Sequence, residues 1–73
     1  MSKYQAVFFP DPYNIGVRDV IIKDKLPDLL QAACNYYKWN NDCPYLFQVL
    51  VGRRWQELPR SVYREFNKML GRF

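Results

Sequence analysis

The side chains of this sequence that could do chemistry are its C-terminal basic residues, and the chemistry they offer is the binding of anions. Residues 1–52 carry five basic and five acidic side chains, so the whole net charge of +4 falls in residues 53–73. Four basic residues there recur at every fourth position, which on a helix places them on one face. They are Arg60, Arg64, Lys68 and Arg72. Such a face attracts nucleic acid or an acidic protein surface, and it equally suits a solvated helix that keeps a small domain in solution.

A second basic group lies beside an expected turn and includes a tryptophan. Arg53 and Arg54 follow Gly52 and precede Trp55, and arginine and tryptophan are enriched where proteins bind one another. We therefore expect Arg53, Arg54 and Trp55 to contact a partner. The alternative is that Trp55 belongs to the core, with both arginines still exposed, because a small domain needs its large side chains inside.

Two consecutive aromatic residues near the N-terminus predict a third contact region. Phe8 and Phe9 point to opposite faces of a strand, so at most one of them can enter a single core. Tyr13 lies in the proline-rich loop that follows. An exposed ring beside a rigid loop can anchor a protein partner or stack on a base of single-stranded nucleic acid. The K/R-G-F/Y-G/A-F-V pattern is absent, so a standard RNA-recognition motif is not expected.

The groups needed for catalysis are scarce. The chain has no histidine and no threonine, and its two serines are Ser2 and Ser61, so Ser-His and Cys-His arrangements cannot form. Asp24 and Asp28 lie one helical turn apart, but acids in a first turn more commonly complement the helix dipole. The three glycines match no phosphate-binding loop. We expect no enzyme activity, no cofactor and no metal, since a structural zinc site needs four Cys or His ligands.

Cysteine usage predicts a reducing compartment. The sequence has two cysteines, Cys34 and Cys43, and two buried reduced thiols are favoured over a disulfide, which would close a short loop. No hydrophobic run reaches the length of a signal peptide or a membrane span. The expected location is the cytoplasm, without membrane association.

The N-terminal third shows the alternation and the turn residues of a β-hairpin. Its first strand has two apolar faces, with Tyr4, Ala6 and Phe8 on one and Val7 and Phe9 on the other. Residues 10–14 contain two prolines, an aspartate and an asparagine, which are typical of a loop. The β-branched stretch 17–23 predicts a second strand paired with the first.

A helix over residues 25–39 has the clearest pattern in the sequence. Its apolar residues follow helical spacing at Leu26, Leu29, Leu30, Ala33, Cys34 and Tyr37. Asp24 is the expected N-cap, and Pro27 falls in the first turn, where its missing N–H has no helical partner to lose. Two asparagines and Asp42 are expected to end the helix.

The C-terminal half predicts one further strand and one further helix. Residues 45–51 are nearly all apolar, which suits a strand inside a sheet, with Gln48 as its one polar residue. Gly52 turns the chain, and residues 53–58 fit either a short returning strand or an ordered loop. Pro59 favours a helix start. The apolar stripe of that helix comprises Val62, Phe66, Met69, Leu70 and Phe73.

These elements predict a single α+β domain over residues 1–73, in the order β-β-α-β-(β)-α. The helices should pack on one face of a three- or four-stranded, mainly antiparallel sheet. Five Phe, six Tyr and two Trp make up 18% of the chain, and rings of this size are expected to build the core of so short a domain.

The sequence as a whole, from MSKYQAVFFPDPYNIG through VLVGRRWQELPRSVYREF, resembles the small regulators that lytic phages of Xanthomonas direct against the RNA polymerase of their host. The resemblance covers the entire chain in length and in its basic, aromatic-rich composition. It implies a protein that binds the polymerase near the N-terminus of the β′ subunit and impedes promoter recognition by the σ-containing holoenzyme. It also implies that elongating polymerase reads through terminators. No family motif assigns these contacts to particular residues.

The residues and the resemblance together predict a non-enzymatic transcription regulator. It is expected to act as a monomer in the host bacterial cytoplasm, where its cationic face can lie near the exiting RNA or an acidic subunit surface. The alternative, from a different class, is a small basic nucleic-acid-binding protein. Inhibition of another host or defence protein would leave similar traces in the sequence.

Overall fold

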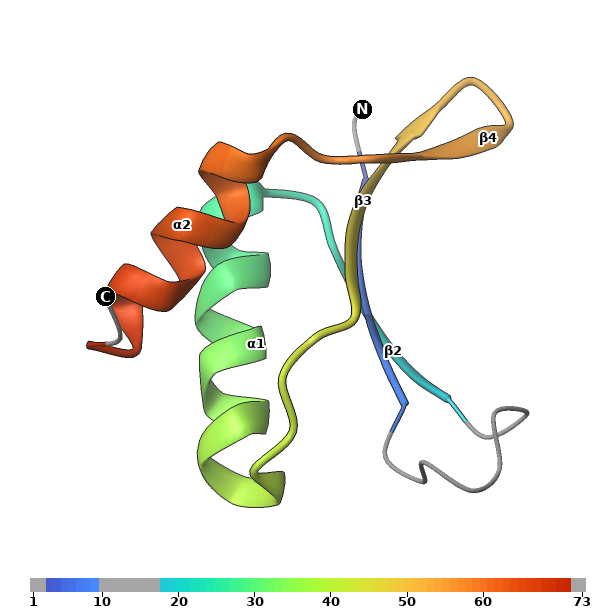
Figure 1. Ribbon diagram of the computed structural model, residues 1–73. Coiled ribbons are helices and arrows are strands. Elements are labelled where there is room, and N and C mark those ends of the chain that lie inside the picture. The colour runs from blue at the N-terminus through green and yellow to red at the C-terminus, as the bar shows by residue number, and fades with distance from the viewer. Residues whose placement is uncertain (1–2, 10–17, 72–73) are drawn as a thin grey trace.

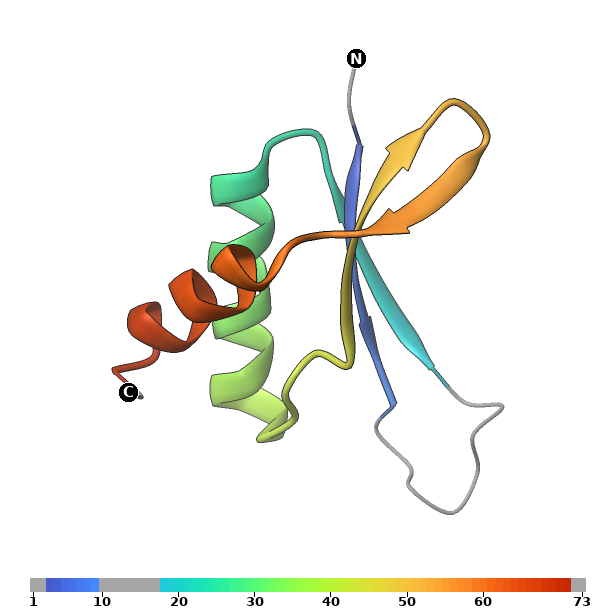
Figure 2. The ribbon, with the colours of Figure 1, turned by 45° about the horizontal axis from the view of Figure 1, so that its top comes forward.

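A computed structural model describes residues 3–9 and 18–71 of the chain. They form β1 (Tyr4–Phe8), β2 (Asp19–Lys23), α1 (Leu26–Asn40), β3 (Leu46–Val51), β4 (Arg54–Glu57) and α2 (Arg60–Met69). The strands make one antiparallel sheet in the order β2-β1-β3-β4, and both helices lie on the same side of it (Figure 1). Figure 2 shows the same two layers from a second direction. The predicted α+β class, with two helices on one face of an antiparallel sheet, is confirmed.

The register of the two central strands decides which side chains face the helices. Ala6 of β1 lies opposite Ile21 of β2 and opposite Phe47 of β3, and all three belong to or pack against the buried core. Because side chains alternate along a strand, Gln5 and Val7 point to the other face. The two apolar faces predicted for the first strand are therefore both present.

Aromatic rings join the sheet to the helices. The ring of Phe8 lies 4.0 Å, between centroids, from that of Tyr36 in α1. The ring of Phe47 meets Tyr63 and Phe66 of α2 at 5.2 and 5.3 Å, in tilted edge-to-face contacts. Phe8 and Phe47 are fully buried, so the expected aromatic core is confirmed for these rings. The smaller buried residues of the cluster are Ala6, Leu29, Leu30, Ala33, Cys34 and Val62.

Helix α1 begins without the cap that its sequence suggested. The N-cap is Lys25, which makes no side-chain cap hydrogen bond, so the prediction of Asp24 as N-cap is wrong by one position. Pro27 does lie in the first turn. The helix ends at Asn40, and its C-cap is Asn41, which adopts a left-handed φ of 59° and whose N–H donates to the carbonyl of Tyr37 at 2.7 Å. Asparagine tolerates this conformation better than most residues, which is why it serves as a C-terminal cap.

The segment after β3 is a strand. β4 pairs with β3, with Val51 opposite Arg54. Of the two predictions for residues 53–58, the returning strand is therefore correct and the ordered loop is not. Gly52, at the first of the two turn positions, has a φ of +62°. Glycine adopts this conformation without the steric cost that a Cβ would bring, and a positive φ at that position is typical of two-residue hairpins.

Helix α2 follows Pro59, as its sequence suggested, and buries Val62 and Phe66. Met69 does not join them: it is 40% exposed, because α2 ends there and its position lies at the margin of the apolar stripe. Phe73, expected in the same stripe, lies outside the described residues.

Both cysteines are thiols, and they differ in exposure. Cys34 is buried as predicted, whereas Cys43 is exposed, so the expectation of two buried thiols is wrong for Cys43, which lies in the connection between α1 and β3. No helix within the described ranges is long and apolar enough to cross a membrane.

Candidate binding surface

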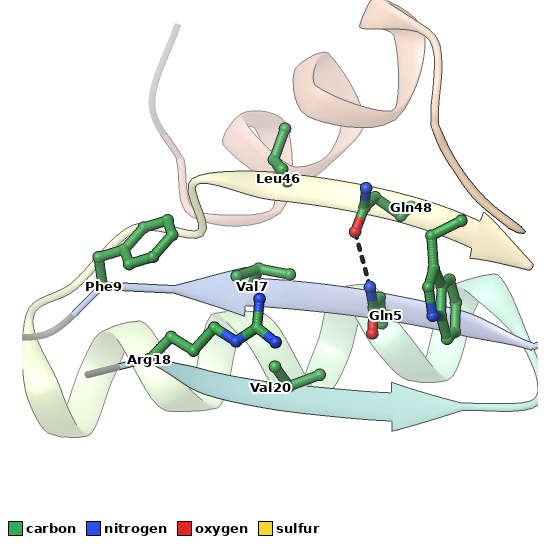
Figure 3. Close-up of a pocket in the computed structure, with 8 residues that line it drawn as sticks. Gln5, Val7, Phe9, Arg18, Val20, Leu46 and Gln48 are labelled. Atoms are coloured by element: carbon green, nitrogen blue, oxygen red, sulfur yellow. Dashed lines mark hydrogen bonds between the residues drawn. The ribbon is translucent and has the colours of Figure 1, made fainter. Parts of the chain in front are cut away.

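One face of the sheet carries neither of the two helices in the described chain, and a groove runs across it (Figure 3). The groove has a volume of about 340 Å³ and draws side chains from all four strands or their ends. Its lining consists of Gln5, Val7, Phe9, Arg18, Val20, Leu46, Gln48 and Trp55. Six of these eight residues lie in the strands, and Phe9 and Arg18 lie directly next to the ends of β1 and β2.

Two glutamine amides are joined in the floor of the groove. Gln5 and Gln48 are directly opposite each other on β1 and β3, and Gln5 Nε2 donates to Gln48 Oε1 at 2.6 Å (Figure 3). Gln5 is only 9% exposed, and burying an amide without a partner would be costly. Within the described ranges no buried side-chain N or O atom lacks a hydrogen bond. Gln5 Oε1 and Gln48 Nε2 take no part in the hydrogen bond between the two amides. These two atoms are therefore open to whatever occupies the groove.

Arg18 and two aromatic rings, those of Phe9 and Trp55, line the groove around the two glutamines. Arg18 extends its guanidinium along the sheet toward the paired residues Val7 and Val20 (Figure 3). Phe9 lies at one end of the groove, and its ring contacts that of Tyr45 edge-on, at 5.1 Å between centroids. Such a site can hold an apolar or aromatic group, with a cation and a donor–acceptor pair of amides beside it.

The structure separates the two phenylalanines that the sequence placed together. Phe8 is fully buried in the core, so its prediction as a partner contact is wrong: its position in β1 turns it toward the helices. Phe9, one residue later, is half-buried on the groove face. Tyr13, the third residue of that prediction, lies outside the described residues.

The hairpin between β3 and β4 holds the second predicted group. Arg53 and Arg54 are exposed, and the hairpin tip projects away from both helices in Figures 1 and 2. Trp55 is half-buried and lines the groove. Trp55 does not belong to the buried core cluster, which was the alternative for this residue.

The predicted cationic face of α2 is present but stands apart from the hairpin. Arg60, Arg64 and Lys68 are all exposed on the side opposite Val62 and Phe66. Arg72 lies outside the described residues. In the part of the chain that the structure describes, no salt bridge engages these basic residues or those of the hairpin. Because α2 and the hairpin tip lie at opposite ends of the molecule (Figure 1), the C-terminal charge forms two separate surfaces.

Sequence reasoning did not single out several residues of the open face. Strand pairing brings together Gln5, Gln48 and Arg18, and the two glutamines are 43 residues apart in the sequence. The one signal in the sequence was that Gln48 interrupts an apolar run. Two large exposed rings were also missed. Trp39, at the end of α1, is 88% exposed, and Tyr45, before β3, is 67% exposed.

The chain matches no protein-family model, and comparisons with curated proteins and with solved structures found no significant match.

Proposed function

We propose that this chain is a non-enzymatic transcription regulator that binds bacterial RNA polymerase in the bacterial cytoplasm, inhibits initiation and promotes read-through of terminators. The resemblance of the whole sequence to phage regulators of this kind supports the choice of polymerase. The observation that carries the binding mode is the hairpin tip, where Arg53 and Arg54 are exposed and without salt bridges in the described chain, next to the groove that Trp55 lines.

This arrangement suits a protein partner. Arginines engage carboxylates through two parallel hydrogen bonds, and an apolar groove beside them can take a side chain of the same partner. Hot spots of protein interfaces commonly combine these two features. In the proposed complex, the hairpin arginines meet acidic residues of the polymerase, and the groove accepts a neighbouring apolar or aromatic side chain.

The distribution of charge argues against a nucleic-acid partner as the main ligand. A protein that follows a phosphate backbone benefits from a continuous basic track. Here the hairpin and α2 are at opposite ends of the molecule, and the groove between the strands has Arg18 as its charged residue. The alternative of a small nucleic-acid-binding protein draws its support from the exposed row of Arg60, Arg64 and Lys68 on α2.

Co-elution tests the proposal directly. The purified chain is mixed with Xanthomonas RNA polymerase and passed through a size-exclusion column at about 0.15 M salt. We expect it to elute with the polymerase, to lower promoter-dependent transcription and to raise read-through at a terminator. Failure to co-elute would reject polymerase as the partner. Strong, salt-sensitive binding of DNA or RNA by the chain alone, in a gel-shift assay, would favour the nucleic-acid alternative instead.

A further inference from the structure

Strand β2 leaves one edge of the sheet open along its whole length. It pairs with β1 on one side and, in the described chain, with nothing on the other. Its apolar residues Val20 and Ile22 are 40% and 50% exposed, and both point to the groove face. An open edge with exposed β-branched residues is a template for another strand.

The hydrogen-bonding pattern identifies which backbone groups of β2 point outward. The Leu50 N–H donates to the carbonyl of Lys3 at 2.8 Å. These two residues come directly next to Tyr4 and Val49, which lie opposite each other in β1 and β3. In an antiparallel pair such bonds recur at every second residue, so odd-numbered residues of β1 bond to β3 and even-numbered ones to β2. The residues of β2 opposite the even-numbered positions are Asp19, Ile21 and Lys23. The N–H and C=O groups of Val20 and Ile22 therefore point away from the sheet.

We propose that two copies of this chain associate through antiparallel pairing of their β2 strands, with Ile21 opposite Ile21 of the second copy. In this register Val20 lies opposite Ile22 of the other copy and exchanges both backbone hydrogen bonds with it. The two-fold axis repeats the exchange at Ile22, which gives four hydrogen bonds in all. The sequence alone predicted a monomer, and the proposal replaces that expectation without depending on the proposed function.

Charge complementarity selects this register. Asp19 and Lys23 lie two residues before and after Ile21, whose side chain packs against the core. Because side chains alternate along a strand, Asp19 and Lys23 therefore point to the face that the helices cover. Pairing about Ile21 therefore places Asp19 opposite Lys23 of the second copy, and it does so twice. These positions are non-hydrogen-bonded pairs, in which side chains come closest. A parallel alignment or a shift by two residues would lose these ion pairs.

The same register covers the exposed apolar residues. On the groove face, Val20 and Ile22 of one copy meet Ile22 and Val20 of the other, which forms a cluster of four β-branched side chains. Cross-strand pairs of β-branched residues stabilise sheets. The five residues Asp19–Lys23 (DVIIK) are thus complementary to themselves in charge, in apolar character and in hydrogen bonding.

The contact involves few residues, so we expect a weak dimer, with a Kd of about 0.1 to 1 mM. Sedimentation and an NMR dilution series measure it. The amide protons of Val20 and Ile22 should exchange more slowly with solvent as the concentration rises, since dimerisation gives them partners. A chain that stays monomeric at about 1 mM, or whose Val20 and Ile22 exchange is independent of concentration, would overturn the proposal.

Charge exchange at the strand tests the register. Lys23→Asp places like charges opposite each other twice, and we expect a dimer about tenfold weaker or more. Asp19→Lys alone should do the same. An equimolar mixture of the two variants restores both ion pairs and should form a heterodimer of near wild-type affinity. Lys25→Asp, an equal charge change outside β2, is the matched control and should leave the Kd unchanged.

Two outcomes would contradict this register specifically. If Lys23→Asp and Lys25→Asp weaken the dimer equally, the effect is one of net charge. If the mixture of variants stays as weak as each alone, the strands pair elsewhere. Should Asp19→Lys fail to fold, because the Tyr36 hydroxyl donates to Asp19 Oδ2 at 2.7 Å, isotope-filtered contacts between the methyl groups of Val20 and Ile22 across copies give an independent test. Their absence in a dimeric sample would reject the pairing.

Discussion

The hydroxyl of Tyr63 in α2 accepts a hydrogen bond from the backbone N–H of Phe47 in β3, at 3.0 Å. The Phe47 carbonyl accepts from Leu58 N–H at 2.8 Å, just beyond the end of β4. At this point β3 would otherwise present a buried N–H without a strand partner, because β4 ends at Glu57. The tyrosine thus completes the ladder and fixes α2 to the sheet, and it donates in turn to Glu57 Oε1 at 3.2 Å.

Tyr63→Phe should therefore cost more stability than the loss of an ordinary surface hydroxyl. It leaves the N–H of the fully buried Phe47 without a partner, for an expected loss of about 1 to 3 kcal/mol in the free energy of unfolding. Urea unfolding followed by circular dichroism measures it. Tyr45→Phe, at an exposed ring, is the control and should change stability by less than about 0.5 kcal/mol. Equal effects of the two substitutions would contradict the role assigned to Tyr63.

The contact between Tyr36 and Asp19 predicts a loss of stability at alkaline pH. Burial, the hydrogen bond to Asp19 and the negative charges of Asp19 and Asp42 raise the pKa of Tyr36 to about 12. Between about pH 10 and pH 12 the folded protein holds a proton that the unfolded chain has lost, so this group's contribution to stability falls as the pH rises through that window. Below about pH 10 the contribution is fully present.

Comparison with Tyr36→Phe isolates this contribution from other groups that titrate in the same range. The free energy of unfolding of the variant should fall less steeply between about pH 10 and pH 12. Asp19→Asn keeps an acceptor but removes a charge, so it should bring the pKa of Tyr36 down, as followed by tyrosinate absorbance. Parallel pH profiles for the wild type and Tyr36→Phe would contradict the assignment.

The two thiols should react at very different rates. Cys34 is buried, and burial raises the pKa of its thiol, which lowers the thiolate fraction that attacks disulfide reagents. Cys43 is exposed. With a chromogenic disulfide reagent at neutral pH, we expect one equivalent to react quickly and the second only as the domain opens. Cys43→Ser should abolish the fast phase, whereas a fast phase that persists in this variant would show that Cys34 is accessible.

Leu30 tests whether the register of α1 was correctly inferred. It is 5% exposed within the core cluster, so Leu30→Ala should cost about 2 to 5 kcal/mol, a large fraction of the stability of so small a domain. Val51→Ala, at a half-exposed position, is the matched truncation and should cost much less. A Leu30→Ala variant with an unshifted melting temperature would be incompatible with this packing.

Local patterns were sufficient for most of the fold. Helical spacing in residues 26–37 encodes which face of that helix is buried, and alternation in residues 4–9 encodes a strand with two apolar faces, because the periods of strands and helices differ. The end of α1 and the turn at Gly52 follow from residues that tolerate left-handed backbone. β4 was ambiguous because four residues between a turn and a proline carry little pattern; pairing with β3 decides it, and that contact is tertiary.

The binding surface was harder to predict, since strand order and layer geometry assemble it. The sequence showed that Phe8 and Phe9 diverge, but which of them is buried depends on the side that the helices cover. Spacing alone gave the cationic row on α2, yet the distance of that row from Arg53 depends on the direction of the β3–β4 hairpin. Gln5 and Gln48 became partners only through the β1–β3 register.

Charge reversal at the hairpin tip separates the two cationic surfaces in the proposed function. The double variant Arg53→Glu, Arg54→Glu should weaken polymerase binding by at least about 1 kcal/mol, or roughly fivefold, while the fold stays intact because both side chains are exposed. Arg60→Glu with Arg64→Glu makes the same charge change on α2 and should have the smaller effect, measured by titration of labelled protein with polymerase. Unchanged affinity in the folded hairpin variant, or a larger loss in the α2 variant, would move the contact from the hairpin to the helix.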